Sequence, residues 1–481
     1  MPIFCYNYTG GIMKTIDNII DDIVKLNVSK KSLDKFNINL IISLLILMMI
    51  PRILFNFTSI NFEYIYNYFL LFLIPMLYIF IYNIKNKYHK NSIDFILLTL
   101  FMVIALISSL HAFNPWMAFL GDASRKTGYL TYIMYYFIYI NSKNINNKED
   151  IFQVLNVMFI IGIINTIFTL LQTYLPYNNI LNKYYINMGY GLMGNPNFLA
   201  TYALLLLSLS IYISLFIKTN KFYKIVTFIM FICLVLASST GPFLSFILIL
   251  IILFIYILVK RKDKIKNILF YICMFIIIFI SIECSSIYVN KNIYNYSINK
   301  TSTISGDISN LVKVVTNKFT SQDIVSDDAL IEKNYQDDKM TEIDAISSGR
   351  LLVYKVVLRY IDYGNYIWLG TGPDNMHIYH IEVNQYNHTG MNEYDKAHNV
   401  YLNILAETGI FSLIVYIAWI IYYHIKTKRC KNEIMYLLLF GLISYNIQGL
   451  LNIDVFVVMP YYFIITGMLI GIGDKLETRK H

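Results

Sequence analysis

The chain has 481 residues, of which 57% are hydrophobic and only 14% are charged, and its mean hydropathy is +0.53. Soluble domains carry about 25% charged residues, so this composition excludes a soluble globular protein and indicates an integral membrane protein. The net charge is +9, and the five cysteines are scattered without metal or disulfide spacing.

Apolar segments of nearly bilayer-spanning length follow one another along the chain, since a membrane-spanning helix needs about 20 apolar residues. The polar residues before the first segment lack the basic region, apolar run and cleavage site of a signal peptide, so we expect that segment to be retained. Twelve spans are predicted, of which the fourth is the shortest: 38–55, 64–82, 93–113, 127–140, 152–174, 197–217, 223–239, 241–259, 267–283, 400–423, 433–451 and 455–473.

Lysine and arginine are distributed unevenly between the two sets of connecting segments. If the N-terminus is cytoplasmic, 25 of the 39 lie in cytoplasmic segments, 4 in the short outer loops and 10 in one long loop. This follows the positive-inside rule and places both termini in the cytoplasm. The predicted parts are a cytoplasmic tail (1–37), a nine-span membrane region (38–283), a large extracytoplasmic loop (284–399), a three-span membrane region (400–473) and a cytoplasmic tail (474–481).

The long loop has two halves of different composition. The acidic tract at 322–344 is predicted to be a solvated surface or a mobile insert. After Arg350, residues 351–361 predict a helix that is apolar on most of its surface and that lies on or dips into the outer membrane surface.

Two polar clusters precede predicted spans on the outer side. Arg125 in 121–129 gains nothing there from the positive-inside rule or the helix dipole, so it needs an anionic partner. That partner is Asp122, a lipid phosphate or a substrate. Asn195 and Asn197 flank a proline in a helix-start pattern; capping alone accounts for them, and substrate contact is the alternative.

A third cluster, 369–375, contains Gly370 and Gly372. Glycines permit a tight turn whose N–H groups can hold an anion. A simple turn is the alternative.

The fourth cluster begins at His398, which stands just before the tenth span. Its reference pKa near 6.5 allows proton exchange near neutral pH, although a lone histidine is more often structural. Glu407 lies within the span, where a carboxylate is costly and needs a partner, so a packing hydrogen bond and a catalytic role both stay open. The spacing of His377, His380 and His388 matches no metal motif, and we predict no metal site.

Taken in order, these motifs resemble the O-antigen ligase and Wzy-type polysaccharide polymerase family. The resemblance implies a GT-C-like all-α membrane fold of about twelve spans, with one large outer loop between the ninth and tenth. The motifs that carry it are Arg125 with Gly128, 194–197, Arg350 with the apolar helix after it, 370–373, 398–402 and 407–409.

The resemblance also implies a function. Family members transfer a glycan from undecaprenyl diphosphate to an acceptor hydroxyl at the outer face of the bacterial cytoplasmic membrane, without a cofactor. The implied partners are the lipid-linked donor, a glycan, lipid or protein acceptor, and membrane lipid, with no nucleic acid. His398 and Arg350 are implied as catalytic residues, and the implied substrate-binding residues are Arg125, Asn195, Asn197, Gly370, Gly372, Asn399, Tyr401 and Glu407.

One turn departs from the family pattern. Many members carry an arginine between the seventh and eighth spans, where this chain has no cation in 237–242 and Thr240 stands instead. Either Arg125 and Arg350 manage the diphosphate, with Lys126 or Arg359, or the donor binds in a different geometry.

Two other kinds of function compete with glycan ligation or polymerisation. A protein O-oligosaccharyltransferase of the same family would use a protein hydroxyl as acceptor. A transporter of lipid-linked glycan would share the spans, but it should carry ionisable residues near mid-membrane, and here the polar motifs gather at the outer ends of the spans.

Overall fold

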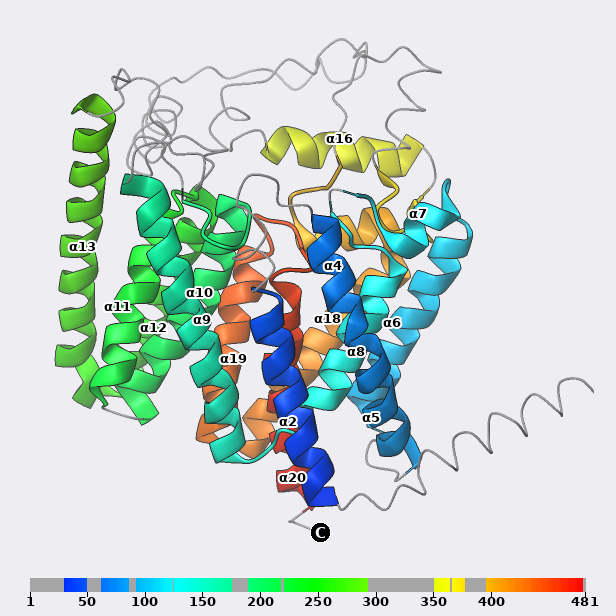
Figure 1. The fold of residues 1–481 in the computed structure, drawn as a ribbon, viewed down its shortest axis with the longest axis horizontal. Coiled ribbons are helices and arrows are strands. Elements are labelled where there is room, and N and C mark those ends of the chain that lie inside the picture. The colour runs from blue at the N-terminus through cyan, green and yellow to red at the C-terminus, as the bar shows by residue number, and fades with distance from the viewer. Residues whose placement is uncertain are drawn as a thin grey trace, which may run out of the picture.

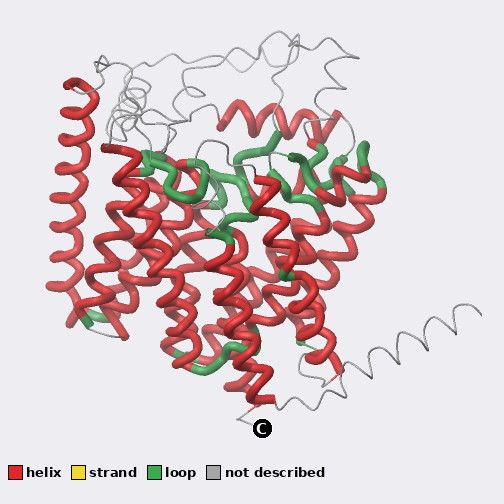
Figure 2. The backbone as a smooth tube through the Cα atoms, in the orientation of Figure 1, coloured by secondary structure: helices red, strands yellow, loops and turns green. Residues whose placement is uncertain are grey.

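The computed structural model describes residues 30–49, 62–85, 92–123, 125–174, 189–217, 220–292, 350–363, 366–376 and 395–478. These residues are helices and loops, with no strand among them (Figure 2). Within these described ranges, six helices are long and apolar enough to cross a membrane. The chain is therefore an all-helical, multi-pass membrane protein, as its composition predicts. The acidic tract at 322–344 and the histidines His377, His380 and His388 lie outside the described residues.

Each of the twelve predicted apolar segments overlaps a helix. The six that meet the length and apolarity of a span are α6, α9, α10 with η1, α12, α13 and α18. In chain order the helices are α2 (Lys30–Leu47), α4 (Phe62–Leu71), α5 (Leu73–Lys85), α6 (Ile93–Leu110), α7 (Pro115–Leu120), α8 (Tyr129–Ser142), α9 (Lys148–Tyr174), α10 (Pro196–Tyr212), the π-helix η1 (Ile213–Ile217), α11 (Lys221–Leu236), α12 (Thr240–Lys260), the 3-10 helix η2 (Lys262–Lys264), α13 (Ile265–Asn292), α16 (Arg350–Tyr363), α18 (Val400–Cys430), α19 (Glu433–Gln448) and α20 (Met459–Thr478).

Some boundaries differ from those that hydropathy predicts. The second segment is divided between α4 and α5 near Pro75, which has no N–H to donate to the carbonyl of Leu71. α13 continues to Asn292 and α18 to Cys430, past the predicted ends at 283 and 423. Both extensions are polar helix, which an apolar window does not detect.

The helices form one bundle with two distinct ends. α16 lies across one end, and most loops gather beneath it (Figures 1 and 2). We call this the site end. The first residues of α2 and the last of α20 lie at the opposite end (Figure 1). Inside the bundle α10 packs against α11 and α19, α6 packs against α18, and α8 packs against α20.

A buried charge network joins several helices at the opposite end. Lys143 Nζ lies 2.6 Å from Asp94 Oδ2 and 3.1 Å from Asp474 Oδ2. Lys426 Nζ lies 2.5 Å from Asp474 Oδ1, so α6, α8, α18 and α20 share one set of charges. We call Asp94, Lys143, Lys426 and Asp474 the Lys143 cluster. Pairing removes most of the cost of placing these charges inside the protein.

The three tryptophans occupy different environments. Trp116 in α7 is 74% exposed and Trp368 is 55% exposed, and both belong to segments at the site end. Trp419 in α18 is inaccessible and packs edge-on against Tyr139, with ring centroids 5.6 Å apart. Tryptophan is enriched at membrane–water interfaces, so we expect Trp116 and Trp368 to lie at an interface near the site end.

We expect the Trp116→Phe, Trp368→Phe double variant to lose most of the fluorescence quenching that headgroup-labelled nitroxide lipids cause in the wild-type protein. Only buried Trp419 remains in that variant, and the bundle shields it from lipid. The measurement is steady-state tryptophan fluorescence in reconstituted vesicles. Undiminished quenching of the variant would place Trp419, not the exposed pair, at the interface.

Candidate active site at the site end of the bundle

His398 stands at the N-terminal entrance of α18 in an uncommon backbone conformation. Its φ is +51°, in the left-handed region that non-glycine residues rarely occupy. Such a conformation costs about 1–3 kcal/mol and persists where the surroundings enforce it. The Tyr354 hydroxyl of α16 donates to the His398 carbonyl at 3.2 Å and to the Leu450 carbonyl at 2.8 Å. The histidine is therefore held between α16 and the loop after α19.

Asn399 supplies part of that constraint. Its side-chain oxygen accepts from the N–H groups of Tyr401 and Leu402 at 3.0 Å each, as a helix N-cap does. Its amide nitrogen donates to the Leu450 carbonyl at 3.1 Å. The Tyr401 hydroxyl donates to the Asn446 carbonyl at 3.0 Å. Both predicted substrate contacts thus also fasten the start of α18.

A buried lysine joins three of the predicted clusters. Lys396 Nζ pairs with Asp374 Oδ1 and lies 2.5 Å from Glu407 Oε1, and all three side chains are nearly inaccessible. Asp374 also accepts from the Thr127 N–H at 2.7 Å, the Thr127 hydroxyl at 2.5 Å and the Asp122 N–H at 3.0 Å. We call Thr127, Asp374, Lys396 and Glu407 the Lys396 cluster. It gives Glu407 the partner that an intramembrane carboxylate needs.

Two members of the Lys396 cluster, Lys396 and Asp374, lie outside the predicted spans, and their surroundings favour the charged form of each. Burial would lower the pKa of Lys396, but the carboxylates of Asp374 and Glu407 raise it above its ordinary value. Burial would raise the pKa of Asp374, but the Lys396 ammonium and the hydrogen bonds from Thr127 hold it below its usual range. Both groups are therefore charged at neutral pH.

The two glycine motifs interlock through their backbones. The N–H groups of Thr371 and Gly372 donate to the carbonyls of Ala406 and Glu407 at 2.9 Å each. Gly409 interrupts α18 with φ +83°, and a methyl group on it would lie 2.0 Å from the Trp368 carbonyl oxygen. These N–H groups, which the sequence offered as an anion nest, are thus occupied within the protein. The reason is that the kink at Gly409 exposes helix carbonyls that need donors.

Gly370 is required for the same contact. Its φ is +70°, and a methyl group there would lie 2.3 Å from the backbone carbon of Glu407. Its N–H donates to the Tyr366 carbonyl at 2.8 Å. Gly370 and Gly372 therefore position the turn against α18.

Arg350, the first residue of α16, directs its guanidinium toward the first turn of α12. A methyl group on Gly241 would lie only 2.9 Å from Arg350 Nη1. Gly241 belongs to the segment 237–242, where this chain has no cation and many members of the family that it resembles carry an arginine. Burial lowers the pKa of Arg350 from its usual value, yet no described residue forms an ion pair with it.

Arg125, in contrast, has a carboxylate partner. Its Nε lies 2.5 Å from Asp395 Oδ2, and both side chains are partly exposed. This carboxylate comes from the loop 395–399, which folds back onto the turn that carries Arg125, and not from neighbouring Asp122. Burial would raise the pKa of Asp395, but the hydrogen bond from Arg125 lowers it.

In addition to burial, the positive charges of Arg350 and Arg125 both lower the pKa of His398. Burial lowers the pKa of His398 from 6.5, and the charge of Arg350 lowers it further, against an opposing effect of Asp395. The imidazole is therefore neutral at pH 7, the form that can accept a proton.

Asn195 and Asn197 lie in a second polar group near α12. Asn195 caps α10 by accepting from the Asn197 N–H at 2.8 Å, which confirms the predicted cap. Asn197 accepts from the Ser239 hydroxyl at 2.5 Å, and its carbonyl accepts from the Asn452 amide at 3.4 Å. The Asn195–Asn197 turn is thereby tied to the turn before α12 and to the loop after α19.

Sequence reasoning assigned no role to three groups that the structure places here. Lys396 and Asp374 are the centre of the Lys396 cluster, and their only signal was a lysine beside His398 and an aspartate after a glycine turn. Asp454, in the loop between α19 and α20, accepts from the Tyr445 hydroxyl at 3.1 Å. Burial raises the pKa of Asp454 to about 7. It followed no recognisable motif.

No set of three or more His, Cys, Asp or Glu side chains that could hold a metal ion occurs within the described ranges.

Comparison with known proteins supports the family. Residues 225–417 match the family model Wzy_C, described as O-Antigen ligase. The match spans α11 to α18 and therefore includes Arg350, the 370–372 turn, Lys396 and His398. The resemblance to the O-antigen ligase and Wzy-type polymerase family is thereby confirmed, and it implies a glycan transferase of ligase or polymerase type. No curated protein matches the chain.

We expect Lys396→Met to destabilise the protein by about 3–5 kcal/mol, because it leaves the carboxylates of Asp374 and Glu407 buried without a counter-ion. The measurement is thermal unfolding of the purified chain in detergent. The matched control is Asp263→Asn, which breaks an exposed pair with Arg261 at 3.2 Å and should leave the unfolding temperature nearly unchanged, because exposed ion pairs contribute little to stability. A Lys396→Met protein as stable as the control would show that the cluster does not hold the site together.

Proposed function

We propose that this protein transfers an oligosaccharide or polysaccharide from undecaprenyl diphosphate to an acceptor hydroxyl, as an O-antigen ligase or Wzy-type polymerase. The observation that carries the proposal is that two unlike groups, a neutral histidine and an arginine, lie at the site end and interact electrostatically. His398 is neutral and held in a left-handed conformation, and Arg350, whose charge it feels, has no carboxylate partner among the described residues.

The proposed membrane arrangement follows from the same end of the bundle. We propose about twelve spans in a GT-C-like fold, with both termini in the cytoplasm and the site end on the extracytoplasmic face of a bacterial cytoplasmic membrane. The basic loops support this orientation, since Lys260 to Lys266 and Lys426 to Lys431 lie at helix ends opposite the site. Residues 1–37 and 474–481 would then be cytoplasmic, 38–283 and 400–473 membrane regions, and 284–399 the outer loop.

The reaction needs one bond formed and one broken. The acceptor hydroxyl oxygen attacks the anomeric carbon of the donor sugar, while the bond from that carbon to the diphosphate oxygen breaks and the diphosphate leaves with the electron pair. His398 takes the hydroxyl proton, a task for which a neutral imidazole is suited. General-base assistance of this kind contributes about 10²–10⁴-fold in rate.

Arg350 is proposed to stabilise the departing diphosphate. Arginine contacts phosphate through two parallel hydrogen bonds, and here its guanidinium stands against the first turn of α12. The N-terminus of a helix adds partial positive charge that favours an anion. Arg350 thus reaches the position where the family arginine is missing at Thr240. Arg125 already shares its charge with Asp395, so we assign it a supporting part.

The other predicted residues are proposed to shape the substrate site. Asn399 and Tyr401 hold the entrance of α18, Gly370 and Gly372 hold the turn beside it, and Glu407 anchors Lys396. Asn195 and Asn197 connect α10 to the turn that faces Arg350. Each acts by keeping His398 and Arg350 in place, as preorganised catalysis requires.

We propose the reacting group of the acceptor, a hydroxyl, and not the acceptor molecule. A lipid core, a growing glycan and a protein side chain all satisfy the same chemistry at His398. A glycan transporter is the less favoured function, because Glu407, the carboxylate within the predicted tenth span, lies near the site end and is paired with Lys396.

We expect His398→Ala to remain folded and inserted but to lose glycan transfer by at least about 10²-fold, since it removes the base. The measurement is product formation in membranes supplied with lipid-linked donor and acceptor. The control is His424→Ala, because His424 lies on α18 away from the site and bonds to the Ile420 carbonyl of its own helix. Normal turnover by His398→Ala would refute the assignment.

We expect Arg350→Ala to weaken donor use and to change the pH profile. In the wild type, activity should fall on the acid side only below pH 6.5, because the lowered pKa of His398 keeps the imidazole neutral down to that range. Removing the Arg350 charge raises that pKa, so the acid limb should move to higher pH.

Arg350→Lys serves as the matched comparison. It retains the charge and the position of the acid limb, but a point charge cannot reproduce the bidentate contact, so donor use should recover only in part. Full activity of Arg350→Lys, or an unmoved acid limb in Arg350→Ala, would contradict the proposed role.

A further inference from the structure

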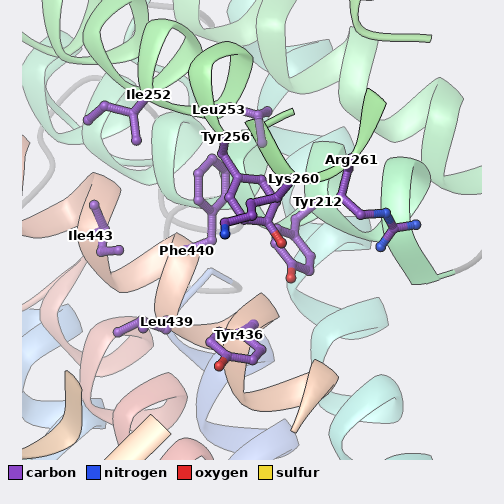
Figure 3. Close-up of a pocket in the computed structure, with 10 residues that line it drawn as sticks. All are labelled: Tyr212, Ile252, Leu253, Tyr256, Lys260, Arg261, Tyr436, Leu439, Phe440 and Ile443. Atoms are coloured by element: carbon purple, nitrogen blue, oxygen red, sulfur yellow. The ribbon is translucent and has the colours of Figure 1, made fainter. Parts of the chain in front are cut away.

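A concave site lies at the end of the bundle opposite His398. It is a groove of about 500 Å³ between α10, α12 and α19. Its volume falls within the range of about 300–1,000 Å³ that ligand sites occupy. The lining residues, shown in Figure 3, are Tyr212, Ile252, Leu253, Tyr256, Lys260, Arg261, Tyr436, Leu439, Phe440 and Ile443.

The body of the groove is apolar and open to the surroundings of the bundle. Ile252 is 42% exposed and Tyr256 is 44% exposed, and both lie on α12, a helix apolar enough to span a membrane. Leu253 and Phe440 are buried at its base. An apolar groove on this face of a membrane protein accepts hydrocarbon.

A break in helical geometry shapes one wall. The last turn of α10 continues as the π-helix η1, a feature that is rare and often found at functional sites. The wider turn brings Tyr212 and Phe216 together, with ring centroids 4.8 Å apart. Phe216 in turn meets Tyr256 at 6.0 Å, so aromatic rings line this side.

The rim of the groove is cationic. Lys260 ends α12, and its ammonium forms no ion pair within the described part of the chain. In Figure 3 its side chain runs toward Tyr212 and Tyr256, whereas the guanidinium of Arg261 points away. Arg261 lies 5.4 Å from the Phe216 ring and shares its charge with Asp263. Lys260 is thus the cation that faces the groove.

We propose that this groove binds one anionic phospholipid, with an acyl chain between α12 and α19 and the phosphate on Lys260. Basic pockets between helices on the cytoplasmic side of membrane proteins recognise anionic head groups, and tyrosine hydroxyls beside Lys260 add donors. The assignment to the cytoplasmic leaflet rests on the orientation proposed above. The lipid is distinct from the donor, whose diphosphate is handled at the other end of the bundle.

The test measures lipid binding to the purified full chain by native mass spectrometry, with dipalmitoyl phosphatidylglycerol and dipalmitoyl phosphatidylcholine titrated separately. We expect the wild type to retain phosphatidylglycerol more tightly, and Lys260→Gln to weaken that lipid about fivefold without changing phosphatidylcholine. Lys262→Gln is the matched control, because Lys262 lies in the same basic loop and does not line the groove; it should change binding less than twofold.

A second pair of variants tests the groove itself. Ile443→Trp fills it and should displace phosphatidylglycerol, whereas Ile255→Trp places the same ring on the exposed face of α12 outside the groove and should not. Equal binding of the two lipids to the wild type, equal effects of Lys260→Gln and Lys262→Gln, or full binding by Ile443→Trp would each overturn the proposal. Since glycan transfer is not measured, failure here is distinguishable from failure of the proposed transferase.

Discussion

The geometry of the site end depends on the buried ion pairs that the Lys396 ammonium forms with two carboxylates. The ammonium lies between Asp374, which belongs to the turn after α16, and Glu407, which belongs to α18. Through Asp374 it also fixes the loop before α8. The turn after α16, the start of α18 and the loop before α8 are thereby joined around Lys396, two residues before His398. A buried ion pair of this kind is weak evidence for added stability, but breaking it leaves an unpaired charge.

The kink in α18 has a related physical cause. Gly409 turns the helix backbone away from regular geometry, and the freed carbonyls accept from the 370–372 turn. The glycine motifs at 370–372 and at 409 thus contact each other. A side chain on Gly370 or on Gly409 would collide with the backbone of the other segment. This contact and the Lys396 cluster together allow His398 to keep a left-handed backbone that it would not adopt alone.

Arg350 and the Lys143 cluster illustrate opposite uses of charge. At the end of the bundle away from the site, each lysine of the Lys143 cluster has a carboxylate within about hydrogen-bond distance, and the network ties helices together. At the site end, Arg125 is likewise paired, but the guanidinium of Arg350 meets a helix N-terminus and a glycine. That arrangement concentrates positive charge where our proposal places the diphosphate.

The sequence by itself determined the membrane class, the positions of the helices and the family, because apolar length and motif order are local properties of the chain. It also identified the cap at Asn195 and pointed to His398. Only the tertiary structure decided the partners: Asp395 for Arg125, Lys396 for Glu407, and Gly241 for Arg350. It also showed that the N–H groups of Thr371 and Gly372 serve α18, and it revealed Asp454 beside Tyr445. These outcomes depend on which loops meet at the end of the bundle, and a contact between segments distant in sequence leaves no periodic or compositional signal in either one.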